Sequence, residues 1–234
     1  MSLICKQLFE HDSSTFTYLL ADSVTREAAI IDAVDAMIER DIALIQELEL
    51  DLKFIIETHI HADHITSACP LKKSFPLAKI VIGIENTDAE ACADIMVGEG
   101  HILPIGEHEI AAIETPGHTP GCISYLVDDK VFTGDALFIR STGRCDFQGG
   151  SASTLYHSIH KLFRLPDSTL VYPAHDYNGF TVSTIDEEKK FNSLIRLDFD
   201  EKTFVKKVGN LDLEPPKKIN TAVPANHSCG LIRN

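Results

Sequence analysis

Four side chains that can bind a metal ion fall within six residues, in the segment THIHADH at residues 58–64. This segment directly follows the run LKFII at residues 52–56, which is short and apolar, as a buried strand is. The imidazoles and the carboxylate should therefore lie on a loop held by a rigid strand, a common place for reactive groups. His59 and His61 are two residues apart, so they point the same way in an extended segment. Histidine and aspartate at this spacing indicate a transition-metal site.

Three further metal-binding side chains each follow a predicted strand. His118 lies in the segment TPGHTPG, where proline and glycine favour a tight loop that leaves the imidazole at its tip. Asp135 and His175 come shortly after two apolar runs, at residues 131–133 and 170–172. Strand ends on one edge of a sheet converge, so we expect these loops to meet the THIHADH loop.

The order of the predicted elements indicates the fold class. We predict strands at residues 4–9, 15–20, 28–31, 52–56, 79–84, 109–114, 122–127, 131–133 and 170–172. We predict helices at residues 38–48, 65–73 and 151–164. The strands come in two batches, each followed by a helix, with no strict βαβ alternation. This pattern favours an α+β sandwich of two sheets with helices outside over a doubly wound parallel sheet.

The chain changes character after residue 183. A charged helix is predicted from residue 185 and another over residues 202–207, and residues 215–226 are expected to be extended. We expect this tail, at about residues 184–234, to pack on the same domain, so that residues 1–234 form a single domain.

Composition excludes several classes of partner. The chain has 234 residues, 44% of them hydrophobic and 24% charged, which is typical of a soluble protein with a sizeable core. A net charge of −14 argues against nucleic acid or an anionic membrane surface as the main partner. No apolar run approaches the roughly 20 residues of a membrane span. The first residues lack the layout of a signal peptide, so a cytoplasmic location is expected.

The six cysteines include no CxxC pair and show no regular spacing. We therefore expect reduced thiols and no disulfide framework. Cys145 is expected to have a structural role.

Four motifs taken together resemble the metallo-β-lactamase superfamily: THIHADH, TPGHTPG, FTGDAL and YPAHDY, in this order. The resemblance covers essentially the whole chain and implies an αββα four-layer sandwich. Within the superfamily the chain is similar to the glyoxalase II group. It resembles the persulfide dioxygenase family more closely, through GRCDFQGG at residues 143–150, YPAHDYNG at residues 172–179, and the tail segments GNL and AVPAN.

The closer resemblance implies oxidation of glutathione persulfide by O2 to sulfite and glutathione. It also implies one Fe(II) per chain, held at the catalytic centre by His59, His118 and Asp135. Two imidazoles and one carboxylate on one face of the iron leave positions for water, substrate sulfur and O2. The other candidate ligands, expected as a hydrogen-bonded support or as a second metal set, are His61, Asp63, His64 and His175.

Substrate-binding candidates are less sharply marked. Arg144 suits bidentate binding of an anion, although it is equally suited to tying down its own loop through Asp146. Tyr177 can donate a hydrogen bond from a cavity wall or pack as an ordinary half-buried tyrosine. Arg196 is a candidate for a glutathione carboxylate. The resemblance further implies a separate rhodanese-type sulfurtransferase as partner, and a homodimer.

Two other functions compete with this hypothesis. Seven candidate ligands suffice for a two-metal hydrolase of the glyoxalase II type, which hydrolyses a glutathione thioester with a metal-bound hydroxide. Ligand counting alone favours that hydrolase, whereas the dioxygenase-like motifs and the short tail favour the dioxygenase. A non-catalytic metal site is the third reading, but structural sites are usually closed, and this ligand set leaves open positions.

Overall fold

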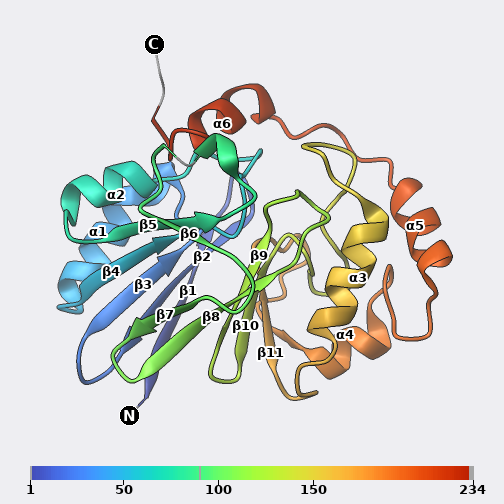
Figure 1. The fold of residues 1–234 in the computed structure, drawn as a ribbon, viewed down its shortest axis with the longest axis horizontal. Helices are drawn as coiled ribbons and strands as arrows, with labels where there is room; N and C mark the ends of the chain where they lie inside the picture. Colours follow the sequence, from blue (N-terminus) through green and yellow to red (C-terminus); the bar gives the residue numbers. More distant parts are fainter. Residues whose placement is uncertain (1, 90, 232–234) are drawn as a thin grey trace.

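Two six-stranded sheets lie face to face in the computed structural model, which describes residues 2–89 and 91–231 (Figure 1). The first sheet has the order β1 (Leu3–Glu10), β2 (Thr15–Asp22), β3 (Glu27–Ile31), β4 (Asp51–Ile56), β5 (Lys79–Gly83) and β6 (Ile95–Val97). The second has the order β12 (Ser183–Thr184), β11 (Leu170–Pro173), β10 (Lys130–Gly134), β9 (Ile123–Val127), β8 (His108–Glu114) and β7 (Ile102–Ile105).

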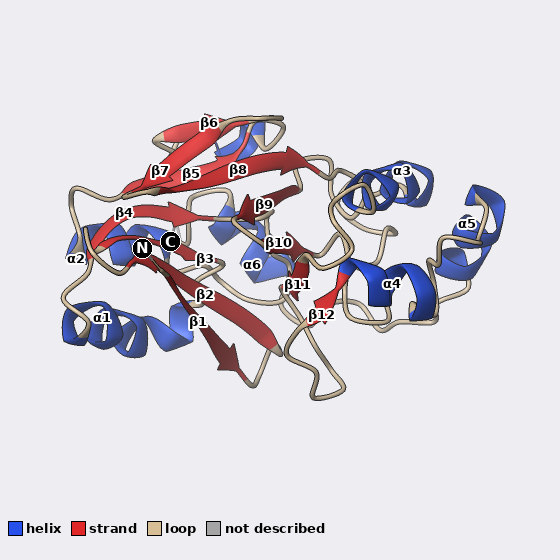
Figure 2. Cartoon of the chain, turned by 90° about the horizontal axis from the view of Figure 1, so that it is seen from below, coloured by secondary structure: helices blue, strands red, loops and turns tan. Residues whose placement is uncertain are grey.

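Helices cover the outer faces of both sheets (Figure 2). The helices are α1 (Ile38–Glu47), α2 (Ala68–Ser74), α3 (Ala152–Leu162), α4 (Ile185–Phe191), α5 (Glu201–Gly209) and α6 (Ile219–Asn226), with short 3-10 turns η1 (Asp35–Met37) and η2 (Thr87–Ala89). Residues of α1 and α2 pack on the first sheet, and residues of α3, α4 and α5 pack on the second. The αββα four-layer sandwich expected from the sequence is confirmed.

Strand β2 shows why the layers form. All eight of its residues are buried. Tyr18 and Leu20 face the core between the sheets, whereas Leu19 and Ala21 face the core beneath α1 and α2. Because successive side chains of a strand point to opposite faces, a strand covered on both sides buries both sets of side chains, and a polar one such as Thr17 is hydrogen-bonded, here to the Asp32 carbonyl.

The two sheets meet at the edge where the predicted ligands lie. Strands β3 and β4 are parallel, and so are β10 and β11, so the loops that follow them leave from matching ends. The amide of Phe16 in β2 donates to the carbonyl of Ala174 at 2.7 Å, which joins the first sheet to the segment carrying His175. The strand ends therefore converge as the sequence predicts.

The prediction of an extended C-terminal segment is wrong, because residues 219–226 form α6. Pro224 lies inside this helix, where its missing N–H costs one backbone hydrogen bond. Burial of Ala222, Ala225 and Asn226 on the domain stabilises the helix despite that loss. Strands β6 and β7, with three and four residues, were also not predicted.

The expectation that all six cysteines are reduced thiols is wrong as well. Cys92 and Cys229 form a disulfide across 137 residues of sequence. Sequence spacing carries no sign of this pair, because only the folded chain brings the segment after η2 and the turn after α6 together. The other four cysteines are free thiols.

Candidate metal centre

The loop after β4 places His59 through a hydrogen-bonded relay. The Thr58 amide donates to Oδ1 of Asp32, and the Thr58 hydroxyl donates to Oδ2 of Asp32, both at 2.8 Å. Because the hydroxyl donates its only hydrogen to Asp32, it must accept a hydrogen bond from Nδ1–H of His59, at 2.9 Å. This bond fixes the tautomer that leaves Nε2 unprotonated, as a metal ligand requires. Burial, together with nearby His61 and His118, holds the pKa of His59 well below its usual value.

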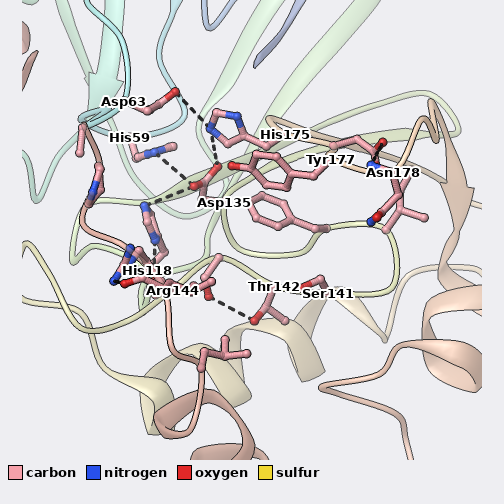
Figure 3. A pocket seen from close by; sticks show the side chains of 18 of the residues that line it. His59, Asp63, His118, Asp135, Ser141, Thr142, Arg144, His175, Tyr177 and Asn178 are labelled. Atoms are coloured by element: carbon pink, nitrogen blue, oxygen red, sulfur yellow. Dashed lines mark hydrogen bonds and ion pairs between the residues drawn. The ribbon is translucent and has the colours of Figure 1, made fainter. Parts of the chain in front are cut away.

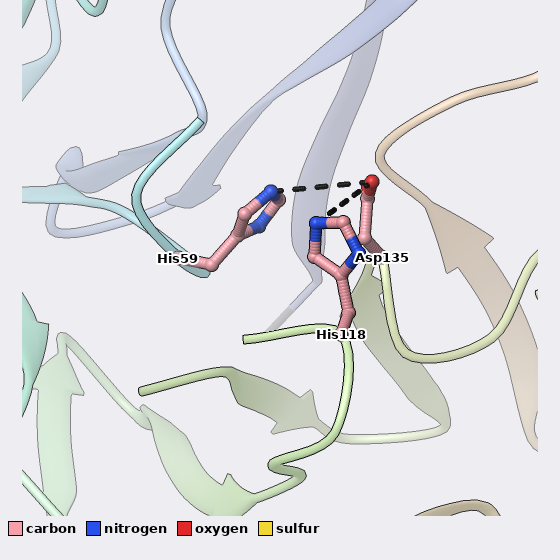
Figure 4. A group of neighbouring side chains, drawn as sticks. All are labelled: His59, His118 and Asp135. Atoms are coloured by element: carbon pink, nitrogen blue, oxygen red, sulfur yellow. Dashed lines mark ion pairs between the residues drawn. The ribbon is translucent and has the colours of Figure 1, made fainter. Parts of the chain in front are cut away.

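A different acceptor fixes the same tautomer in His118. Its Nδ1 lies 2.6 Å from the carbonyl oxygen of Arg144, which can only accept a hydrogen bond. The proton is therefore on Nδ1, and Nε2 is free to bind a metal. Nε2 of His118 points toward Asp135, whose Oδ2 lies 3.5 Å away (Figure 4).

Asp135 reaches the same point from the end of β10. The preceding Gly134 has a φ of +53°, and a Cβ there would lie 2.6 Å from the Thr58 hydroxyl, so glycine is required. Oδ2 of Asp135 is 4.0 Å from Nε2 of His59. Oδ1 is buried without a hydrogen-bond partner among the described residues.

The donor set of His59, His118 and Asp135 fits a metal ion. Their ligand atoms all lie within 4.8 Å of one another. Atoms bound at about 2.1 Å to one ion lie about 3 to 4 Å apart, which matches these separations. A buried carboxylate oxygen without a hydrogen bond is costly unless it binds something, and two imidazoles with a carboxylate suit a transition metal.

A second group lies beside the first and comprises His61, Asp63 and His175. Nε2 of His175 lies 3.5 Å from Oδ1 of Asp135 and 3.6 Å from Oδ2 of Asp63 (Figure 3). Burial lowers the pKa of His175, but these two carboxylates outweigh it and the pKa is raised. His64 adds an ion pair to Asp63 through Nδ1 at 3.0 Å. The structure thus brings together all seven predicted ligands.

His61 also has buried acidic partners that the sequence analysis missed. Its Nε2 lies 3.2 Å from Oδ1 of Asp32 and 3.4 Å from Oε2 of Glu57. Burial lowers the pKa of His61, and Asp32 then Glu57 outweigh it, so the pKa is raised well above its usual value. Asp32 and Glu57 each follow a predicted strand directly, so the signal that identified Asp135 also marked them.

A cavity of about 370 Å³ opens over the first group. It is lined by His59, Asp63, His118, Asp135, Arg144, His175 and Tyr177, by residues of the segments 138–143 and 176–178, and by tail residues between 211 and 216. Tyr177 is 69% exposed, and its ring is stacked on His175 with the ring centroids 6.0 Å apart. Arg196 is not among the lining residues, because its guanidinium pairs with Asp198 and lies over the ring of Phe199.

Arg144 lines the cavity but is engaged by the protein. Nε and Nη2 donate to the two oxygens of Asp146, each at 2.7 Å. Nη1 donates to the Glu214 carbonyl, and Nη2 to the Leu213 carbonyl. A guanidinium has five N–H groups, so these four bonds leave at most one for a substrate. Arg144 therefore anchors the tail as a wall of the cavity.

Comparison with known proteins agrees with this architecture. The family model for the metallo-beta-lactamase superfamily matches residues 12–175. The chain is 47% identical to the mitochondrial persulfide dioxygenase ETHE1 of Homo sapiens and 46% identical to that of Mus musculus, over 98% of this chain and 89% of each relative. The crystal structure of ETHE1 from Myxococcus xanthus covers 97% of this chain and 100% of its own, with a TM-score of 0.93 and 45% identity. Glyoxylase B2 of Dictyostelium discoideum is 33% identical over 94% of this chain and 89% of its own.

Proposed function

We propose that this chain, which belongs to the metallo-beta-lactamase superfamily, is a persulfide dioxygenase. The proposal rests on sequence identity: the chain is 46–47% identical to the persulfide dioxygenases of mouse and man over 98% of its length. A similar identity, 45%, is found with the solved structure of ETHE1 from Myxococcus xanthus, which covers 97% of this chain. The glyoxylase relative is markedly less similar.

The proposed cofactor is one Fe(II) per chain, held by His59, His118 and Asp135. Bound Fe(II) supplies the redox chemistry with O2 that no side chain provides. The protein keeps both imidazoles in the ligating tautomer through Thr58 and the Arg144 carbonyl. The ion pairs of His61 with two buried carboxylates support a role for this histidine outside the metal's first ligands.

The proposed substrate is glutathione persulfide. Its terminal sulfur is oxidised to sulfite and O2 is reduced, with water supplying the third oxygen and glutathione leaving as the thiol. The cavity over the metal group holds Tyr177 as a hydrogen-bond donor for the substrate. Arg144 contributes mainly through the cavity wall, and a role for Arg196 would require its guanidinium to leave Asp198.

Three expectations concern the chain's surroundings. A separate rhodanese-type sulfurtransferase is proposed to supply persulfide, and a homodimer and a cytoplasmic location remain predictions. The mammalian relatives named above are mitochondrial. In the described part of the chain, no helix is both long and apolar enough to span a membrane.

The second candidate is a two-metal hydrolase of glutathione thioesters. The group of His61, Asp63 and His175 favours it, since these atoms lie close enough to hold a second ion. The test gives the Fe(II)-loaded protein glutathione persulfide or S-lactoylglutathione and counts the metal. The proposal expects sulfite from the persulfide, no thioester hydrolysis and about one iron per chain, as a facial triad with open positions provides. Thioester hydrolysis with two metals per chain would favour the hydrolase.

A further inference from the structure

Two side-chain amides from distant parts of the chain bind the backbone of the metal loop, which we define as residues 57–66. The Asn226 amide nitrogen donates to the carbonyls of His61 at 2.8 Å and His64 at 2.9 Å. Its amide oxygen accepts from the Thr66 N–H at 2.9 Å. The Gln148 amide donates to the carbonyl of Ile60 at 2.8 Å. Four backbone groups of the loop are thus held by two side chains.

These bonds meet a physical need of the loop. The metal loop bends around its ligands between β4 and α2, and its residues are largely buried, with His61 and His64 at 0% exposure. Buried peptide groups outside a helix or ladder must find other partners. A primary amide offers two donors and an acceptor, and Asn226 uses all three on the loop while itself only 2% exposed.

The segment that carries Asn226 is fastened against the loop. The disulfide of Cys92 and Cys229 ties the end of α6 to the first sheet's side of the domain, and the Cys69 amide donates to the Cys229 carbonyl at 3.0 Å. Gly230 has a φ of +87°, and a Cβ there would lie 2.0 Å from the Thr66 carbonyl oxygen. The end of the tail therefore packs directly on the loop's own backbone.

Gln148 comes from the other side, in the GRCDFQGG segment. This segment also places the Arg144 carbonyl on His118, and its first residue, Gly143, donates its amide to the Asp135 carbonyl at 3.0 Å. One short segment thus contacts the metal loop, His118 and Asp135, which together carry the three ligands of the first group.

We propose that Asn226 and Gln148 are positioning residues of the metal centre, acting as an amide clamp on the metal loop. By fixing the peptide groups at 60, 61, 64 and 66, they set the direction from which His59 presents Nε2. The inference rests on the metal site of the proposed function but not on its reaction, since either a dioxygenase or a hydrolase would need the same loop geometry.

The experiment replaces each amide by its isosteric carboxylate, in Asn226→Asp and Gln148→Glu. A carboxylate cannot donate, so its oxygens would face loop carbonyls. Matched controls make the same change at exposed sites: Asn220→Asp on α6 and Gln46→Glu on α1. Co(II) is the probe, with the dissociation constant measured by chelator competition and the coordination geometry read from the visible spectrum. Thermal melting of the metal-free proteins reports overall stability.

We expect Co(II) to bind about 10- to 100-fold more weakly to both clamp variants, with an altered spectrum, as for other supports of metal ligands. The controls should match the parent. The proposal is overturned if the folded clamp variants bind Co(II) with the same dissociation constant and spectrum as the parent protein. A lower melting temperature would not rescue it, because loss of stability alone is what a merely structural role predicts. Gln148 is only half-buried, so Gln148→Glu decides the matter if Asn226→Asp fails to fold. Failure of the parent to bind Co(II) would overturn the metal site itself.

Discussion

Nδ1 of His118 donates to the carbonyl oxygen of Arg144 across 2.6 Å. A segment whose sequence resembles the persulfide dioxygenases therefore holds a candidate metal ligand directly. The same bond fixes the imidazole's tautomer, because a carbonyl can only accept. Two features of the sequence that look separate, a histidine loop and a glycine-rich loop, form one site.

Removing a ligand of the first group should remove the metal. We expect His118→Ala and Asp135→Ala to retain almost no iron after loading and desalting, because each loses one of three ligands in a site built around them. Iron per chain, measured by elemental analysis, checks this, with the exposed His101→Ala as control. Near-full occupancy in either ligand variant would show that another set of residues binds the metal.

The Thr58 hydroxyl should matter through the tautomer of His59. Thr58→Val keeps the shape of the side chain but leaves Nδ1 of His59 and Oδ2 of Asp32 without this partner. We expect metal affinity to fall by about 10- to 100-fold, as for other partners of metal-bound histidine. Chelator competition measures it. The control is Thr169→Val, which removes a buried hydroxyl before β11, and equal losses in both variants would contradict the relay.

The disulfide should stabilise the fold measurably. Cys92→Ser releases a cross-link that spans 137 residues. Such a cross-link contributes roughly 2–4 kcal/mol to the free energy of unfolding, and for a chain of this size that corresponds to a fall of about 5–15 °C in melting temperature. Thermal melting without reductant checks this, with the free thiol Cys69→Ser as control. If dithiothreitol leaves the melting temperature of the parent protein unchanged, the pairing of Cys92 with Cys229 is contradicted.

Cys145 should be a poor nucleophile across the physiological pH range. Burial first, with smaller contributions from Cys122 and Asp146, raises its thiol pKa to about 12. Because the thiolate reacts and the thiol does not, only about one molecule in 10,000 is reactive at pH 8. Alkylation by iodoacetamide, followed by mass spectrometry, should be far slower than for free cysteine and should rise about tenfold per pH unit. Rapid alkylation at pH 7 would show an exposed, activated thiol in place of a structural one.

The site was more predictable than the tail, and the reason is physical. The candidate ligands follow strands, so local patterns of apolar residues place them at one edge of the sheets. Asn226 has no local signature, because its partners lie about 160 residues earlier and only folding brings them together. The same holds for Cys92 and Cys229.

Local rules also failed where tertiary packing outweighed them. Pro224 argues against a helix by itself, yet burial of Ala222 and Ala225 holds α6 in place. The sequence makes Arg196 a candidate for binding a glutathione carboxylate, whereas in the fold it pairs with Asp198 and does not line the cavity. Arg144 does line the cavity, but its guanidinium donates four hydrogen bonds to the protein and so anchors the tail.

The most direct test of the proposed function measures O2 consumption and sulfite together. Fe(II)-loaded protein receives glutathione persulfide in an oxygen-electrode cell, and sulfite is assayed when uptake ends. The persulfide dioxygenase predicts equal amounts of O2 consumed and sulfite formed, with neither observed for Asp135→Ala. Absence of O2 uptake by protein that demonstrably holds iron would contradict the proposal.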